Sequence, residues 1–246
     1  MTAAPKTSAA PAPPKSRLRH ELESWAKAIG VALAVWLVLK SYLVEAFRIP
    51  SPSMENTLLV GDFLFVNKTA FGGEFSIPFT GWRFGKVPGY GTPLRGEVVI
   101  FRSVEDSTPN LSVVKRIIGA PGDTLQMVSD TIYLNGKAQE EPYALHLGSD
   151  PNGDVFYRRQ IREHQLPYYV GADPAQYKPT THNWGPIVVP PDHYFMMGDN
   201  RDESYDSRFW GFLPQAHVLG RPLFIYLSVD TRPLRIRWNR FLKHPA

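Results

Sequence analysis

The 246-residue chain is long enough for one or two domains, and its net charge of +4 is too small by itself to indicate a nucleic-acid-binding protein. Hydrophobic residues make up 43% of it and aromatic residues 13%, so a real core can form and wholesale disorder is excluded. The absence of cysteine excludes disulfide scaffolds, thiol catalysis, zinc–thiolate sites and iron–sulfur clusters.

The N-terminal residues 1–24 are predicted to form a tail without a core of its own. Residues 1–15 are mainly Ala, Pro, Lys, Ser and Thr, which bury little apolar area, so we expect them to be disordered. Residues 16–23 are polar and helix-prone, which predicts a helical lead-in to the apolar stretch that follows.

That apolar stretch covers residues 25–46, and three interpretations compete for it. A buried core helix would explain why only residues 28–39 are free of charge, since a membrane span needs about twenty residues. A removed signal peptide would explain the small-x-small pattern that ends at Ala46. We favour an uncleaved transmembrane anchor over 25–46, because Lys40 can extend its amine to the membrane surface.

Basic residues ahead of this stretch set its predicted orientation. By the positive-inside rule they place the N-terminus in the cytoplasm and everything after residue 45 outside the cytoplasm, in a single pass. These basic residues are Lys6, Lys15, Arg17, Arg19 and Lys27.

The rest of the chain is predicted to be mostly β, an all-β body of folded antiparallel sheets. Short apolar or alternating runs are bounded by turn signals, and Asn135-Gly136 is a strong signal for a two-residue hairpin. We expect a main β domain from residues 47–137 and 187–246, with residues 138–186 as an inserted β-rich subdomain. The predicted strands lie at 63–66, 98–101, 113–114, 117–118, 132–134, 187–189, 194–197 and 223–227.

Three segments of unusual composition stand out: residues 47–58, 113–123 and 198–208. Each has an ordinary explanation. Ser-Pro-Ser at 51–53 is common in turns, Lys115 can be a lysine that protects a strand edge, and 198–208 can be a solvated charged loop. No spacing rule connects the three segments, so residue chemistry alone leaves the function open.

Together with Arg95-Gly96-Glu97-Val98-Val99-Ile100-Phe101, the three segments resemble the signature boxes of bacterial type I signal peptidases. The boxes occur in that family's order. The resemblance implies a membrane-anchored serine endopeptidase that uses a Ser–Lys pair, without a metal or organic cofactor, to remove signal peptides from exported preproteins at the outer face of the cytoplasmic membrane. The implied partners are those signal peptides and the lipid bilayer, with no nucleic acid; the oligomeric state stays open.

The resemblance also implies roles for individual residues. Ser53 matches the nucleophile, Lys115 the general base, and Ser51 the hydroxyl that forms the oxyanion hole with the Ser53 backbone N–H. Ser204 matches the serine that orients the lysine. The supporting charged residues are Arg116, Asp199, Arg201, Asp206 and Arg208. The residues that match the substrate pockets are Ile49, Pro50, Met54, Leu58, Val113 and Val114.

Two positions depart from the family pattern: Asn56 stands where many members have Pro, and Pro52 where some have Gly. Neither removes a reacting group. A lysine with its ordinary pKa near 10.4 is almost wholly charged at pH 7, so Lys115 must be desolvated and kept away from carboxylates to act as a base. Because side chains alternate along a strand, we expect Val113 and Ile117 to supply most of its burial.

Two other functions compete with the general signal peptidase. One is a specialised maturation peptidase for a single secreted component, which only a substrate assay separates from the general enzyme. The other is a non-catalytic, membrane-tethered β-domain that binds a partner, which predicts a damaged Ser–Lys pair. The sequence retains both Ser53 and Lys115.

Overall fold

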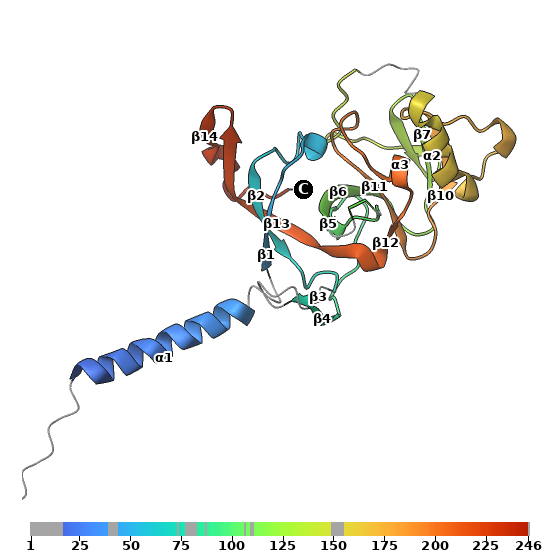
Figure 1. The fold of residues 1–246 in the computed structure, drawn as a ribbon. Helices are drawn as coiled ribbons and strands as arrows, with labels where there is room; N and C mark the ends of the chain where they lie inside the picture. The colour runs from blue at the N-terminus through green and yellow to red at the C-terminus, as the bar shows by residue number, and fades with distance from the viewer. Residues whose placement is uncertain are drawn as a thin grey trace, which may run out of the picture.

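The computed structural model describes residues 17–38, 44–72, 74–76, 83–86, 88–105, 107–108, 111–148 and 155–245. The tail predicted to be disordered, residues 1–15, lies outside this part of the chain. The described body consists of curled antiparallel sheets, from which one N-terminal helix projects (Figure 1). This confirms the prediction of a mostly β fold.

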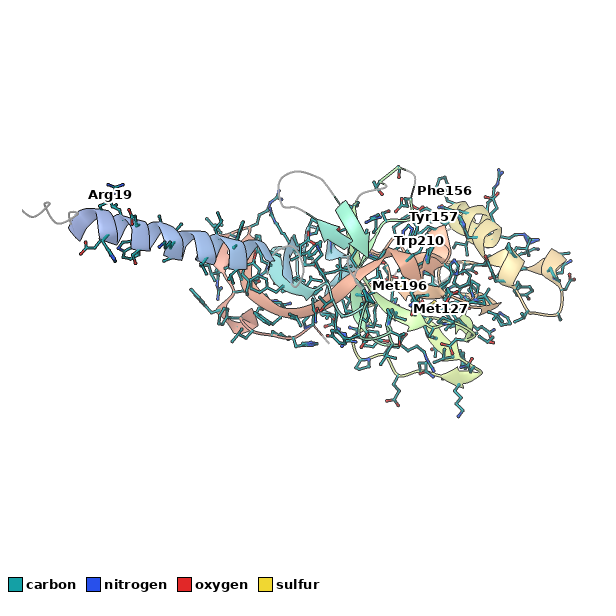
Figure 2. All side chains as sticks on the ribbon, turned by 90° about the horizontal axis from the view of Figure 1, so that it is seen from below. Arg19, Met127, Phe156, Tyr157, Met196 and Trp210 are labelled. Carbon is teal, nitrogen blue, oxygen red and sulfur yellow. The ribbon has the colours of Figure 1, made fainter. Side chains whose placement is uncertain are left out.

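Helix α1 (Arg17–Val38) carries the start of the apolar stretch. It points away from the β body, with Arg19 near its outer end (Figure 2). None of the helices in the described ranges has the length and apolar character needed to cross a membrane. The first half of α1 is charged, and strand β1 (Val44–Arg48) begins inside the range predicted as the anchor. The prediction of a spanning helix over 25–46 is therefore not met by the described residues.

The main sheet has eight strands, all paired antiparallel, in the order β1-β2-β13-β5-β6-β11-β12, with β14 paired to β13. Ala46 of β1 lies opposite Phe65 of β2, so a cut after Ala46 would remove part of a paired strand. The other strand bounds are β2 (Asp62–Asn67), β5 (Val98–Arg102), β6 (Ser112–Gly119), β11 (His193–Met197), β12 (Leu213–Pro214), β13 (Val218–Thr231) and β14 (Leu234–Ile236).

The long strand β13 gives this sheet its curl. It has two register shifts against β2 and one against β5, and such bulges bend a strand and increase its twist. Gly220 lies at the crossing point, where a Cβ atom would come within 2.5 Å of the Asn67 carbonyl oxygen. A residue without a side chain therefore lets β13 pass close to the end of β2.

Both faces of the central strands are buried, which explains their nearly continuous apolar sequences. In β5, Val98 and Ile100 pack into one core cluster with Met54 and Leu58, and Val99 packs into a second cluster on the opposite face. Strand β11 alternates in the same way between the second cluster and a third, which lies against the small sheet. Lys115 thus lies in a packed strand, and the turn that carries Ser53 packs against the same strands through Met54.

A four-stranded sheet, in the order β10-β7-β8-β9, forms the other end of the body. Asn135 and Gly136 join β8 to β9 with φ of 51° and 79°, which confirms the predicted two-residue hairpin. These strands are β7 (Thr124–Val128), β8 (Thr131–Leu134), β9 (Lys137–Ala138) and β10 (Trp184–Val188), and a separate pair is β3 (Glu74–Ser76) and β4 (Arg83–Lys86).

The prediction of a β-rich insert over 138–186 is wrong for the described residues. They contain helix α2 (Arg158–Gln165) and the 3-10 turns η3 (Val155–Tyr157), η4 (Leu166–Tyr168) and η5 (Pro174–Gln176). Phe156 and Tyr157 lie beside α2 in Figure 2. Ile161 is the one buried aliphatic residue of α2, so this short helix has no repeating apolar pattern that a sequence could reveal.

Candidate active site

A cavity of about 320 Å³ opens where the start of η2 (Pro52–Met54) meets β6 and the loop after β11. It brings together three segments that are far apart in the chain. Among the residues that line it are seven that the sequence singled out: Ile49, Pro50, Ser51, Ser53, Val113, Val114 and Lys115. Its volume and mainly apolar lining suit a short stretch of peptide.

Ser53 sits in the first turn of η2 and is 7% exposed. Pro52 starts this turn, as is common at the first position of a helix. The Ser51 side chain makes no capping bond to the turn; its Oγ lies 3.4 Å from the Ser53 Oγ. The Ser53 N–H belongs to the first turn, whose donors have no partner within the helix, so it is available to an external acceptor.

Lys115 lies in β6 and is only 3% exposed. Val99 is its partner across the sheet, and Val99, Val113 and Ile117 pack in one cluster, whereas Val114 packs in another. Residues directly opposite each other in a sheet share a face, which supports the prediction that Val113 and Ile117 help to bury the lysine. Within the described chain, no hydrogen bond joins the Lys115 amine to another residue.

Burial among these apolar residues lowers the pKa of Lys115 from 10.5 to about 8. The Asp206 carboxylate opposes this shift, the Arg208 guanidinium adds to it, and Asp199 opposes it more weakly. A larger share of the amine is therefore neutral near pH 8 than in an ordinary lysine, as a general base requires.

The expectation that carboxylates would be kept away from Lys115 is wrong, because Asp206 and Asp199 both act on it. Each is held by an arginine instead. Arg208 Nε and Nη2 donate to Asp206 at 2.9 and 3.0 Å, and Arg116 Nε and Nη2 donate to Asp199 at 2.8 and 2.7 Å. Burial raises the pKa of Asp206, but the charge and hydrogen bonds of Arg208, the charge of Lys115 and the hydrogen bond from Ser204 together outweigh burial, so its pKa lies below the ordinary value. Paired charges weaken the field that each carboxylate exerts on the lysine.

The loop after β11 connects these charges to the nucleophile turn. Asn200 N–H donates to the Ser53 carbonyl at 3.2 Å, and Ser204 Oγ donates to Asp206 Oδ2 at 2.6 Å and accepts from Gly198 N–H at 3.1 Å. A Cβ atom on Gly198 would lie 2.4 Å from both Ser204 Oγ and the Ser53 carbonyl oxygen. Gly198 therefore permits the close approach of the two serine segments.

The structure brings further residues into the site that the sequence analysis did not identify. Thr57 Oγ1 donates to Asp199, and Arg201 forms two bonds of 2.8 and 2.7 Å with Glu141, which precedes Tyr143. Glu141 and Tyr143 lie in the insert. Glu141 is 60 residues from Arg201 in the chain, and Tyr143 contacts Arg116 of β6, so no local sequence signal links them to the site. The only sequence signal is the charged composition of residues 198–208, which indicates that Arg201 has a partner but not which residue that partner is.

Two predicted pocket residues, Met54 and Leu58, do not line the cavity. Both are wholly buried in the core cluster that includes Val98 and Ile100. Met54 follows Ser53 directly, so its side chain anchors the nucleophile turn to the core. Among the described residues, no group of three or more His, Asp or Glu side chains is arranged to hold a metal ion.

Comparison with known proteins gives consistent matches. The family model described as "Signal peptidase, peptidase S26" matches residues 22–227. The chain is 36% identical over 222 residues to signal peptidase I of Pseudomonas aeruginosa, covering 84% of this chain and 73% of that protein. It is 33% identical over 214 residues to signal peptidase I of Bacillus licheniformis, covering 86% and 92%. A crystal structure of a signal peptidase I from Enterococcus faecalis is 29% identical, with a TM-score of 0.36, and covers 53% of this chain and 96% of that one.

Proposed function

Because the chain belongs to the peptidase S26 family of signal peptidases, we propose that it cleaves signal peptides from exported preproteins with Ser53 as nucleophile and Lys115 as general base. The observation that carries the proposal is a buried amine with a lowered pKa on the wall of the cavity that also contains Ser53. A buried lysine that forms no salt bridge within the described part of the chain is otherwise hard to explain, since burial of a charge is costly.

The proposed reaction begins with the neutral Lys115 amine, which takes the hydroxyl proton as Ser53 Oγ attacks the scissile carbonyl. Catalytic hydrogen bonds are often long before substrate binds, so we expect the bond between Ser53 and Lys115 to close when substrate expels water. Ser204 already donates its proton to Asp206, which leaves a lone pair of its oxygen to accept from the lysine and orient it.

The developing oxyanion is proposed to bind the Ser53 backbone N–H and the Ser51 hydroxyl. The N–H is free within its turn, and the hydroxyl lies beside the nucleophile. Lys115 then returns its proton to the departing amine, and the acyl-enzyme is hydrolysed by a water molecule that the same amine activates. Arg116, Asp199, Arg201, Asp206 and Arg208 support this site without contacting the substrate.

The preprotein is proposed to bind as an added strand along β6. Residues 112–115 of β6 pair with β5 on one edge, whereas β11 pairs with β6 only from Arg116 onward, so the other edge is open beside the cavity. Ile49, Pro50, Val113 and Val114 line this part of the cavity and suit small side chains at the first and third positions before the cut.

The proposed location is the outer face of the cytoplasmic membrane. It is supported by the apolar sequence of residues 28–39 and the basic residues that precede it. Membrane fractionation and protease protection of the full chain in cells test this location separately from the chemistry.

The proposed function is tested by incubating the purified full chain in detergent with a purified preprotein. The product's new N-terminus is determined by mass spectrometry, with Ser53→Ala as the matched control. We expect one cut after a small residue by the unmodified chain and none by the variant. A panel of unrelated preproteins distinguishes the general enzyme from a specialised maturation peptidase, which would cut one of them. Equal turnover by Ser53→Ala would refute the proposal.

A further inference from the structure

A short part of the insert, residues 141–147, touches all three segments that carry the candidate catalytic groups; we call it the clamp. Its backbone lies parallel to the loop after β11. Leu145 N–H donates to the Asp199 carbonyl at 2.7 Å, and Arg201 N–H donates to the Leu145 carbonyl at 2.9 Å. The Leu147 N–H donates to Asp202 at 2.6 Å. The clamp is thus fixed to the loop that carries Ser204 and Asp206.

The clamp is also tied to the nucleophile turn through Asn56. Asn56 Nδ2 donates to the carbonyls of Tyr143 and Pro142 at 3.0 and 3.5 Å. Asn56 has a φ of 86°, which proline cannot adopt and asparagine tolerates better than most residues. The asparagine at this position therefore supplies both a backbone conformation and a side-chain bond to the clamp.

Two clamp side chains, Glu141 and Tyr143, reach the buried charges. Glu141 is bound by both terminal nitrogens of Arg201, and Tyr143 Oη donates to the same carboxylate at 2.9 Å. Burial and the neighbouring Glu141 raise the pKa of Tyr143, so its hydroxyl stays a proton donor. These bonds hold the aromatic ring in one orientation.

The Tyr143 ring covers the guanidinium of Arg116, which lies 3.8 Å from the ring centroid. Arg116 is the residue that pairs with Asp199, and both side chains are almost fully buried. A cation over an aromatic face is attracted by the ring, more strongly where water is excluded. The ring also occupies space from which water could otherwise reach the ion pair.

On the basis of the proposed function, we propose that Tyr143 is a positioning residue, whose ring holds Arg116 on Asp199 and so sets the electrostatic environment of the Lys115 amine. Without the ring, Arg116 neutralises Asp199 less completely. The remaining negative charge of Asp199, which already acts on Lys115, favours the protonated amine. Deprotonation of Lys115 therefore moves to higher pH.

The test compares the pH dependence of kcat/KM for the unmodified chain, Tyr143→Ala and Tyr143→Phe. Tyr143→Phe keeps the ring over Arg116 and loses only the bond to Glu141. We expect Tyr143→Ala to shift the acid limb upward by up to about half a pH unit, with KM nearly unchanged, because Asp199 acts on Lys115 less strongly than Asp206 and is only partly released from Arg116. We expect Tyr143→Phe to keep the original midpoint. An unshifted limb in Tyr143→Ala, or equal shifts in both variants, would overturn the proposal.

Tyr133→Ala is the matched control, since Tyr133 is a half-buried tyrosine of β8 outside the clamp. An equal shift in this variant would show a nonspecific loss of packing and count against the role of Tyr143. A second measurement needs no substrate. A small amine-reactive reagent labels the folded chain at a series of pH values, and mass spectrometry measures the extent of labelling of Lys115. A shift in labelling supports the clamp even if no preprotein is cleaved, whereas cleavage with unshifted labelling overturns the clamp alone.

Discussion

The pH dependence of cleavage follows directly from the burial of Lys115. With a pKa of about 8, about one-tenth of the amine is neutral at pH 7 and about half at pH 8. If the neutral amine is the base, kcat/KM rises about tenfold between pH 6 and 7, about fivefold between pH 7 and 8, and levels off above pH 9. An ordinary lysine with a pKa near 10.4 would instead give a rise of about tenfold per unit up to about pH 9 and a further rise of about sevenfold between pH 9 and 10.

The assay measures cleavage between pH 6 and 10, at substrate concentrations below KM. The substrate is a peptide in which no group titrates in this pH range. The free energy of unfolding in urea over the same range shows whether the fold itself changes with pH. Ser53→Ala gives the uncatalysed background. An acid limb with its midpoint near 10, or a rate that does not change with pH, would refute the assignment of Lys115 as a desolvated base.

Three further predictions concern stability and substrate binding. Lys115→Met should raise the free energy of unfolding in urea at pH 7 by up to roughly 3 kcal/mol, because it removes a buried charged amine. The unfolded chain binds the proton of Lys115 more tightly than the folded chain does, since the pKa is lowered on folding. The stabilisation should therefore fade as pH rises from 8 to 10.5. Gly198→Ala should abolish cleavage even where circular dichroism shows a folded chain, because its Cβ meets Ser204 Oγ and the Ser53 carbonyl at 2.4 Å. Tyr205→Ala should raise KM several-fold with kcat nearly unchanged in steady-state assays, because Tyr205 lines the cavity and is 44% exposed.

The contrary results are equally specific. A lower free energy of unfolding for Lys115→Met at pH 7 would show that desolvation of the Lys115 amine does not destabilise the fold. Normal cleavage by Gly198→Ala would show that the two serine segments need not approach so closely. An unchanged KM in Tyr205→Ala would place the substrate elsewhere in the cavity.

The strands that sequence predicts well are those with a strong local pattern. β2, β5, β8 and β11 are apolar or alternating runs between turn residues, and the structure confirms each of them. The prediction divides β6 into two pieces, 113–114 and 117–118, because Lys115 and Arg116 interrupt its apolar sequence. In the structure β6 is continuous, since Arg116 is paired with Asp199, 83 residues away. A buried charge whose partner is distant in sequence looks like a break in a strand.

The candidate site shows the same limit. The boxes that resemble a known family predicted the side chains around the cavity, but the partners of those side chains come from elsewhere. Glu141 and Tyr143 lie in a segment with weak strand signals, and their positions are set by Arg201 and Arg116 rather than by local sequence. Similarly, Met54 and Leu58 belong to the family's pocket segment, yet here both are buried in the core.

The most direct test of the central claim uses the absence of cysteine from the chain. Lys115→Cys introduces the single thiol of the protein, which 2-bromoethylamine can convert to a side chain that ends in a primary amine at nearly the position of the lysine amine. We predict that the untreated variant is inactive towards a preprotein, that alkylation restores Ser53-dependent cleavage, and that Lys115→Ala treated in the same way stays inactive. Full activity of the untreated variant, or no recovery in a folded chain that mass spectrometry shows to be fully alkylated, would contradict the role of the Lys115 amine.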